Sequence, residues 1–189
     1  MPTSASVPSH SPPPARRLAY LRRLAAKDWG APQGFGGRVG YQVIPALALE
    51  RLGVPATGYQ WAYLDYALDL LRKRQDCQDF VMVGLIHVLY RYGGSRHMTS
   101  EQRDEVTRVL FAAKFSDLDP GTDSCCWLTE NHQVQYLSSE FLLGQLLPDA
   151  IFTNTVKPGR WHAERARAPL LRWLDWRQRF AFSEWNSSC

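Results

Sequence analysis

Apolar residues recur at every third or fourth position along most of the chain, which is the spacing of one face of an α-helix. No stretch alternates cleanly between apolar and polar residues, and no two-residue hairpin turn stands out, so the pattern does not favour strands. The helices that it predicts span 16–27, 41–52, 60–74, 80–92, about 100–113, 130–147 and 162–180. We therefore predict an all-α protein.

Residues at the expected helix ends agree with this interpretation. Pro45 falls in a first turn, and Gly53 ends that segment. Thr99 or Ser100 is a suitable cap for the helix that follows, with Gln102 in its first turn. Successive helices of this length, several of them apolar nearly all round, predict antiparallel helical hairpins.

Length and composition favour a single folded domain. The chain has 189 residues, of which 45% are hydrophobic, and this is enough to build a core. Residues 1–14 are rich in proline and serine and are predicted to form a disordered tail, so the helical domain is expected over 15–189. We expect no membrane span, because no apolar run is long enough.

The N-terminal region does not resemble a cleavable signal peptide. Arginine pairs stand at 16–17 and 22–23, but only Leu24, Ala25 and Ala26 follow them before Lys27. A secretory signal needs an apolar stretch of roughly 7–15 residues there. The localisation therefore stays open.

Positive charge is concentrated near the N-terminus. The chain carries a net charge of +4, and five of its basic residues lie between Arg16 and Lys27. Without those five, it has 17 basic and 18 acidic side chains, a net charge of −1. The body is thus nearly neutral, and nucleic acid is not an expected partner, although a basic N-terminal helix that binds nucleic acid or an anionic surface stays open as an alternative.

Cofactor motifs are not evident. The glycine-rich stretch 30–40 lacks the G-K-[ST] ending of a phosphate loop and does not follow a strand. The four cysteines show no C-x-x-C spacing, and the five histidines form neither H-x-x-x-H nor H-E-x-x-H. We expect no metal and no cofactor, with the cysteines as buried free thiols and a metal or redox role as the alternative.

The densest polar cluster stands at the start of the helix predicted over 130–147. It reads W-L-T-E-N-H-Q and comprises residues 127–133. Helix capping by Thr129 and Glu130 accounts for part of it. Helical spacing also places His132, Tyr136 and Glu140 in one row, which suits either proton transfer or a hydrogen-bonded structural ladder.

A second cluster combines aromatic rings with acids and amides near the C-terminus. It reads W-L-D-W-R and then F-A-F-S-E-W-N-S over 173–187. Aromatic faces beside carboxylates and amides are what a sugar site needs, whereas packing in a helical core is the structural alternative.

These two strings, together with L-x-G-Q-x-x-P-D-x-x-F-x-N and H-x-x-R-A between them, resemble a family of largely uncharacterised microbial proteins. The resemblance covers about 120–188. It implies a partial (α/α) toroid of helical hairpins, similar to the toroids of polysaccharide lyases and some glycoside hydrolases, with a polysaccharide or oligosaccharide as partner. Such toroids usually have more helices, so the resemblance also suggests a truncated member.

The resemblance implies two alternative sets of catalytic residues. A lyase would use His132 or Tyr136 as base, with Asn131 polarising a uronate carboxyl group. A hydrolase would use two carboxylates, Glu130 and Glu184, with Asp175 as a substitute. Substrate binding is expected from Trp127, Gln133, Asp175, Arg177, Glu184 and Trp185. A non-catalytic domain that binds a glycan or a protein, or an inactive toroid, is the alternative.

Overall fold

The computed structural model describes residues 15–27, 43–55, 61–96 and 98–181. It confirms the all-α prediction for them. The elements are α1 (Ala15–Ala26), α2 (Ile44–Arg51), α3 (Trp61–Lys73), α4 (Gln78–Tyr92), α5 (Ser100–Ala112), α6 (Glu130–Leu146), β1 (Ile151–Phe152), β2 (Lys157–Pro158) and α7 (Gly159–Phe180). The predicted N-terminal tail and the glycine-rich stretch lie outside the described residues.

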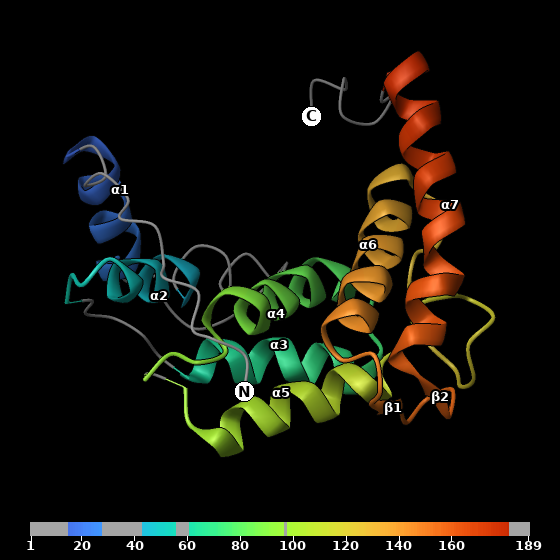
Figure 1. Cartoon of the computed structure of the whole chain (residues 1–189), viewed down its shortest axis with the longest axis horizontal. Coiled ribbons are helices and arrows are strands. Elements are labelled where there is room, and N and C mark those ends of the chain that lie inside the picture. The colour runs from blue at the N-terminus through green and yellow to red at the C-terminus, as the bar shows by residue number, and fades with distance from the viewer. Residues whose placement is uncertain (1–14, 28–42, 56–60, 97, 182–189) are drawn as a thin grey trace, which may run out of the picture.

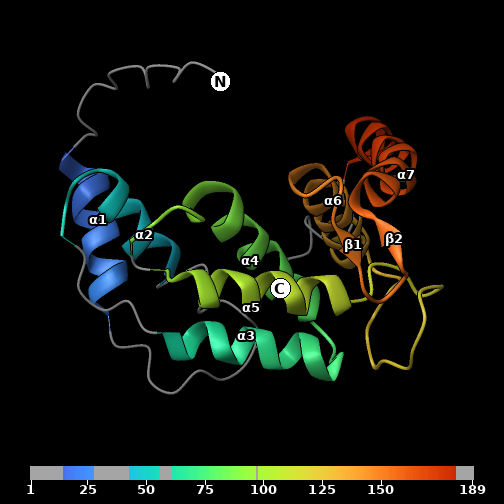
Figure 2. The ribbon, with the colours of Figure 1, turned by 60° about the horizontal axis from the view of Figure 1, so that its bottom comes forward.

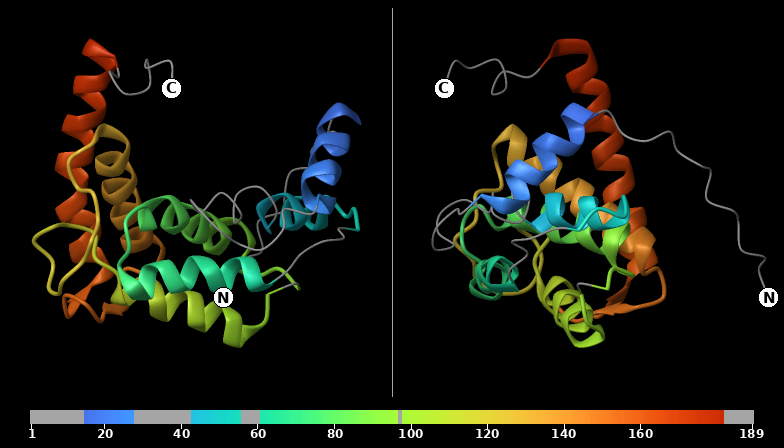
Figure 3. Two further views of the ribbon diagram at one scale, coloured as in Figure 1. Left: turned by 180° about the vertical axis from the view of Figure 1, so that it is seen from behind. Right: turned by 90° about the vertical axis from the view of Figure 1, so that its left-hand side faces the viewer.

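The helices form three groups along the molecule. Helices α1 and α2 pack together at one end, α3, α4 and α5 lie side by side in the middle, and α6 and α7 rise as an antiparallel pair at the other end (Figures 1 and 3). The main hydrophobic core lies among α2 to α6 and includes Leu68, Leu85 and Leu110, all fully buried. Its far edge, where α4 contacts α6, positions the candidate site.

Local sequence signals set the helix ends. Pro45 occupies the first turn of α2, where its missing N–H costs nothing. Thr99 and Gln102 form a capping box at the start of α5, as predicted. At the start of α4, by contrast, Cys77 has a φ of 64° and makes no side-chain cap, so this non-glycine residue holds a left-handed backbone conformation.

Two glycines let α6 and α7 approach each other closely. A Cβ atom on Gly144 would lie 2.4 Å from the carbonyl oxygen of Gly159 and 2.7 Å from the backbone nitrogen of Ala163. A Cβ atom on Gly159 would lie 2.1 Å from the carbonyl oxygen of Leu147. Any larger residue at either position would force the two helices apart, so these glycines set the geometry of the pair.

A small antiparallel hairpin joins α6 to α7, and the sequence pattern did not predict it. Its two strands have two residues each, with Ile151 opposite Pro158 and Phe152 opposite Lys157. The hairpin lies against α5 (Figure 2), and the ring of Phe152 stacks on Phe111 at a centroid distance of 4.8 Å. Helix α7 begins at Gly159, three residues before the predicted start, directly after the second strand.

None of the described helices is long and apolar enough to cross a membrane.

Candidate functional site

The first turn of α6 is built by more than its cap residue. Thr129 is the N-cap of α6, but its side chain accepts no capping hydrogen bond; its hydroxyl donates to Asn131 Oδ1 at 2.7 Å. The same amide oxygen accepts from the backbone N–H of His132 at 2.7 Å. The amide of Gln133 donates to the carbonyl oxygen of Leu128 at 2.9 Å. Asn131 and Gln133 thus connect the preceding loop to the helix. The sequence analysis expected only Thr129 and Glu130 to have a structural role there.

His132 faces a buried carboxylate on α4. Its Nδ1 lies 2.9 Å from Asp79 Oδ2, and the Asp79 side chain is fully buried. Burial raises the pKa of Asp79 to about 6, although the neighbouring imidazole lowers it. The contact is close but not aligned as a hydrogen bond, so both carboxylate oxygens and Nδ1 lack a hydrogen-bond partner among the described residues. The rings of Phe80 and His132 pack edge to face, with their centroids 5.4 Å apart.

Tyr136 lies one turn further along α6 and is almost completely buried. Its hydroxyl accepts a long hydrogen bond of 3.4 Å from the amide of Gln78, and the same amide lies 3.1 Å from the sulfur of Cys125. Burial, together with the thiol, raises the pKa of Tyr136 well above its ordinary range. The phenol therefore stays protonated at neutral pH.

The third member of the row, Glu140, belongs to a buried ionic network that the sequence did not reveal. Glu140 Oε1 lies 2.6 Å from Nδ1 of His162 and accepts from Nε of Arg165 at 2.7 Å. The other nitrogen of His162 lies 2.7 Å from the hydroxyl of Thr155. Arg165 also binds Asp119 through two hydrogen bonds, of 2.5 and 3.1 Å. Two carboxylates therefore share one guanidinium between α6, α7 and the loop after α5.

This network shifts the pKa values of two of its members, Asp119 and Arg165. Burial opposes ionisation of Asp119, but hydrogen bonds from Arg165 and from the backbone N–H of Phe115 outweigh it and lower the pKa of Asp119. Burial likewise opposes the charge on Arg165, and the two carboxylates outweigh it and raise its pKa. The predicted row on α6 is real, since His132, Tyr136 and Glu140 are all buried. His132 and Tyr136 both contact α4, through Asp79 and Gln78, whereas Glu140 pairs with His162 and Arg165 of α7.

A pocket of about 360 Å³ opens beside this network. Its apolar wall comes from α6, α7 and the loop between α5 and α6, and consists of Phe115, Leu118, Leu128, Leu137 and Pro169. Its polar groups belong to Ser116, Asp117, Gln133, Glu140 and Arg165. Trp127 and Tyr136 supply the aromatic surface, so three of the residues predicted from the sequence, Trp127, Gln133 and Tyr136, meet in one pocket.

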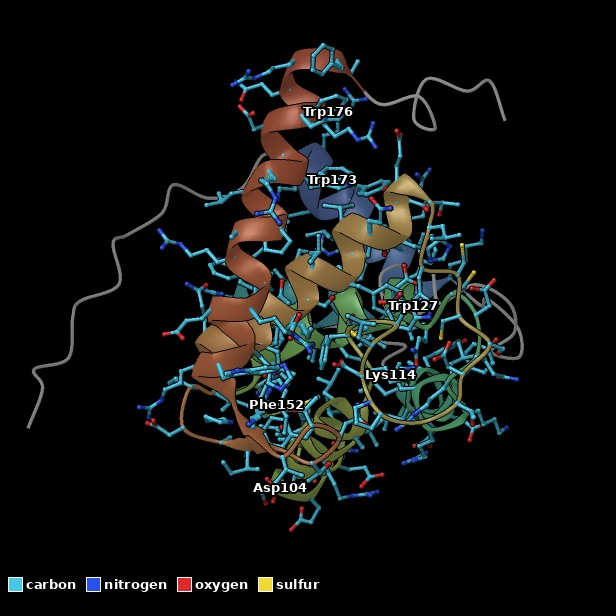
Figure 4. The ribbon with its side chains drawn as sticks, turned by 90° about the vertical axis from the view of Figure 1, so that its right-hand side faces the viewer. Asp104, Lys114, Trp127, Phe152, Trp173 and Trp176 are labelled. Carbon is cyan, nitrogen blue, oxygen red and sulfur yellow. The ribbon has the colours of Figure 1, made fainter. Side chains whose placement is uncertain are left out.

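The indole of Trp127 is held in place from several sides. Its ring stacks on Tyr136 with centroids 4.1 Å apart and planes 30° from parallel. Its N–H donates to Asp123 Oδ1 at 3.0 Å, and the ammonium of Lys114 lies 5.7 Å from the ring centroid (Figure 4). Lys114 also forms a salt bridge with Asp123. Burial opposes ionisation of Asp123, but these donors outweigh it and lower its pKa to about 2.

The remaining predicted residues lie elsewhere. Glu130 forms a salt bridge with Arg177 of α7, which brings two of them together outside the pocket lining. Asp175 forms an exposed salt bridge with Arg179 one turn away. Glu184 and Trp185 lie outside the described residues. The distance between the two carboxylates of the expected pair, Glu130 and Glu184, is therefore not described.

Two further residues with potential metal-ligand atoms, Asp76 and Cys77, lie close to His132. Side-chain ligand atoms of Asp76, Cys77 and His132 all lie within 4.8 Å of one another. Asp76 Oδ1 accepts from the backbone N–H of Cys126 at 2.8 Å. Burial and the nearby charges of Asp76 and Asp79 raise the pKa of Cys77 to about 11. The described cysteines, 77, 125 and 126, are partly exposed free thiols, so the expectation that they are buried does not hold for them.

Sequence reasoning missed Asp79, Asp119, His162 and Arg165. The paired residues are far apart along the chain, so local spacing carries no sign of the pairs. A charged residue in a helix that is otherwise apolar, such as Asp79 in α4, is the one signal that could have pointed to a buried pair.

Comparison of this chain with known protein families, with curated proteins and with solved structures finds no match. We therefore infer its function from the geometry of the site.

Proposed function

We propose that this protein is a carbohydrate-binding helical domain that holds a sugar residue in the pocket beside Trp127. The observation that carries the proposal is the fixed indole at the wall of a pocket that also presents Gln133 and Arg165. Aromatic faces pack on the C–H groups of sugars, and amide and guanidinium donors bind hydroxyl groups. An indole already stacked and hydrogen-bonded loses little conformational freedom when a ligand arrives.

The dimensions and lining of the pocket support this proposal. Small-molecule sites have volumes of roughly 300–1,000 Å³ and apolar walls with a few polar groups that orient the ligand. A pocket of about 360 Å³ lies near the lower end of that range, which suits one or two sugar rings rather than a long buried chain. Part of the loop between α5 and α6 forms the rim, with Leu118 and Leu128 largely exposed.

The charges around the pocket favour a neutral sugar over a uronate. Arg165 is the guanidinium that lines the pocket, and Asp119 and Glu140 already neutralise it. A uronate carboxylate placed there would also approach Asp117 and Glu140. Hydroxyl groups, which both donate and accept, fit this mixture of carboxylates and donors better.

Glycoside hydrolysis is the second candidate function, and one observation favours it. Asp117 and Glu140 both line the pocket, and most glycoside hydrolases place two carboxylates on either side of the bond that they cleave. In that mechanism one carboxyl group protonates the leaving oxygen and the other carboxylate activates water or attacks the sugar. An Asp117→Asn variant would then lose hydrolysis and keep sugar binding.

The helical arrangement proposed for this domain is part of an (α/α) toroid. Its support is the antiparallel pairing of α6 with α7 beside a layer of further helices (Figure 1). The pocket lies between that pair and the loop that joins α5 to α6.

A panel of neutral and acidic oligosaccharides tests the proposal. Binding is followed by calorimetry, cleavage by a reducing-end assay, and lyase products by the ultraviolet absorbance of unsaturated uronate. The proposal expects heat with a neutral oligosaccharide that is lost in Trp127→Ala. Binding of acidic glycans alone would contradict the neutral-sugar assignment, and binding that persists in Trp127→Ala would place the site elsewhere.

A further inference from the structure

The buried pair of His132 and Asp79 contains polar atoms that have no aligned hydrogen bond. The His132 side chain is only 9% exposed and that of Asp79 is 0% exposed. Neither carboxylate oxygen of Asp79 nor Nδ1 of His132 has a properly aligned hydrogen bond among the described residues. Buried polar atoms without partners are rare and call for a specific explanation, of which an absent ion is one.

Two potential ligands lie close to the same imidazole. Asp76 and Cys77 connect α3 to α4, and their ligand atoms lie within 4.8 Å of each other and of His132. Asp76 is exposed to solvent and Cys77 is half-buried, so an ion has a path from solvent to the imidazole. Asp76 is also oriented, because one of its oxygens accepts from the backbone N–H of Cys126.

We propose that Asp76, Cys77 and His132 form a binding site for a transition-metal ion of the zinc type, with Asp79 behind the histidine. Thiolate, imidazole and carboxylate are the three ligand types that zinc takes in proteins. Because Nδ1 faces Asp79, Nε2 is the atom assigned to the metal. This site is separate from the sugar pocket and does not depend on its occupant.

The position of Asp79 matches the usual support of a metal-bound histidine. Such a histidine donates its second N–H to a carboxylate, which fixes the tautomer and the direction of the ring. Metal at Nε2 would place the proton on Nδ1, where a small ring rotation aligns it with Asp79 Oδ2, already 2.9 Å away. A metal at Nε2 would thus hold the imidazole in the neutral tautomer that can donate to Asp79.

The ligand spacing needs only a modest contraction. Zinc bonds of about 2.0–2.3 Å in tetrahedral geometry separate the ligand atoms by roughly 3.3–3.8 Å, against the limit of 4.8 Å found here. Binding converts the Cys77 thiol to a thiolate, with one proton released to solvent as the sulfur–metal bond forms. A water molecule takes the fourth position.

Cobalt titration of the full chain, without an affinity tag and under reducing, oxygen-free conditions, tests this site. One equivalent of Co²⁺ should produce the sulfur-to-cobalt charge-transfer band and the visible bands of a tetrahedral site, and Zn²⁺ should displace it. Cys77→Ser should abolish the charge-transfer band, and His132→Gln should remove the tetrahedral bands. Asp79→Asn should keep the bands but weaken binding about 10–100-fold.

Cys125→Ser is the matched control, because Cys125 is another free thiol whose sulfur contacts the backbone of the turn after α3. It should bind cobalt like the unchanged protein. Circular dichroism shows whether each variant is folded. Absence of a one-to-one spectrum in the folded unchanged protein would overturn the proposal. An unchanged charge-transfer band in folded Cys77→Ser, or its loss in folded Cys125→Ser, would overturn it too.

Discussion

Trp127 and Tyr136 stack face to face, with their ring centroids 4.1 Å apart, at the wall of the pocket between the helical pair and the loop that joins α5 to α6. Tyr136 comes from the buried face of α6, and Trp127 comes from the loop before it. The stack therefore holds a loop residue against a helix, although loops are generally more mobile than helices. It gives the pocket an aromatic surface whose position the core fixes.

Asp123 should matter to sugar binding although it lies behind the indole. Its carboxylate accepts from the N–H of Trp127 and pairs with Lys114, so Asp123→Asn removes a salt bridge and loosens the ring. We expect oligosaccharide affinity to fall about 3- to 10-fold, corresponding to roughly 1 kcal/mol for one hydrogen bond. Calorimetric titration measures it, and Asp175→Asn, whose salt bridge is exposed and distant from the pocket lining, should leave the affinity unchanged.

The same aspartate should make stability depend on acid. Because its folded pKa of about 2 is below the ordinary value of about 3.9, the stabilisation is present above pH 4 and is lost as pH falls through 2. Urea midpoints recorded from pH 2 to 7 should decline more steeply on the acid side for the unchanged protein than for Asp123→Asn. Parallel pH profiles for the two proteins would contradict this assignment.

Arg165 should be the most sensitive charged residue for stability. Its replacement in Arg165→Met leaves Asp119 and Glu140 buried without their shared cation, and breaking a buried ion pair costs about 3–5 kcal/mol. Because Arg165 is 27% exposed, we expect the lower part of that range. Urea unfolding at pH 7 measures the loss, and Arg108→Met, which breaks an exposed pair with Glu105, should change stability by less than about 1 kcal/mol.

Lowering the pH should change the stability of the unchanged protein and that of Arg165→Met in opposite directions. In the unchanged protein the lowered pKa of Asp119 means that its stabilisation is present above about pH 4 and is lost at lower pH. In Arg165→Met burial dominates, the folded pKa rises above the unfolded value, and stability should increase as pH falls from 7 toward 4. A variant that loses stability over that range would contradict the role given to Arg165.

Gly144 should tolerate no side chain. Gly144→Ala would place a methyl group against the backbone of α7, and overpacking of this kind costs about 1–3 kcal/mol. Gly94→Ala is the control, since a Cβ atom there meets nothing within 4 Å. Thermal or urea unfolding compares the two. Equal stability in both variants would mean that the close crossing of α6 and α7 is not rigid.

The helices could be predicted because their apolar residues recur at helical spacing, and their ends carry local signals such as Thr99 with Gln102. The hairpin of β1 and β2 could not, because strands of two residues are too short to show an alternating pattern. Trp127, Gln133 and Tyr136 stand near one another in the sequence, and they meet in the pocket. Arg165 could not be placed beside Asp119, because that contact depends on how the α6–α7 pair docks on the loop after α5.

The central claim is that the indole of Trp127 binds a neutral sugar. Calorimetric titration of a neutral oligosaccharide into the unchanged protein, Trp127→Ala and Trp176→Ala measures it most directly. Trp176 is exposed on α7 and does not line the pocket, so its variant is a matched control. We expect the affinity to fall at least about 10-fold in Trp127→Ala, a loss of roughly 1.4 kcal/mol, and to be unchanged in Trp176→Ala. Equal affinity in all three folded proteins would contradict it.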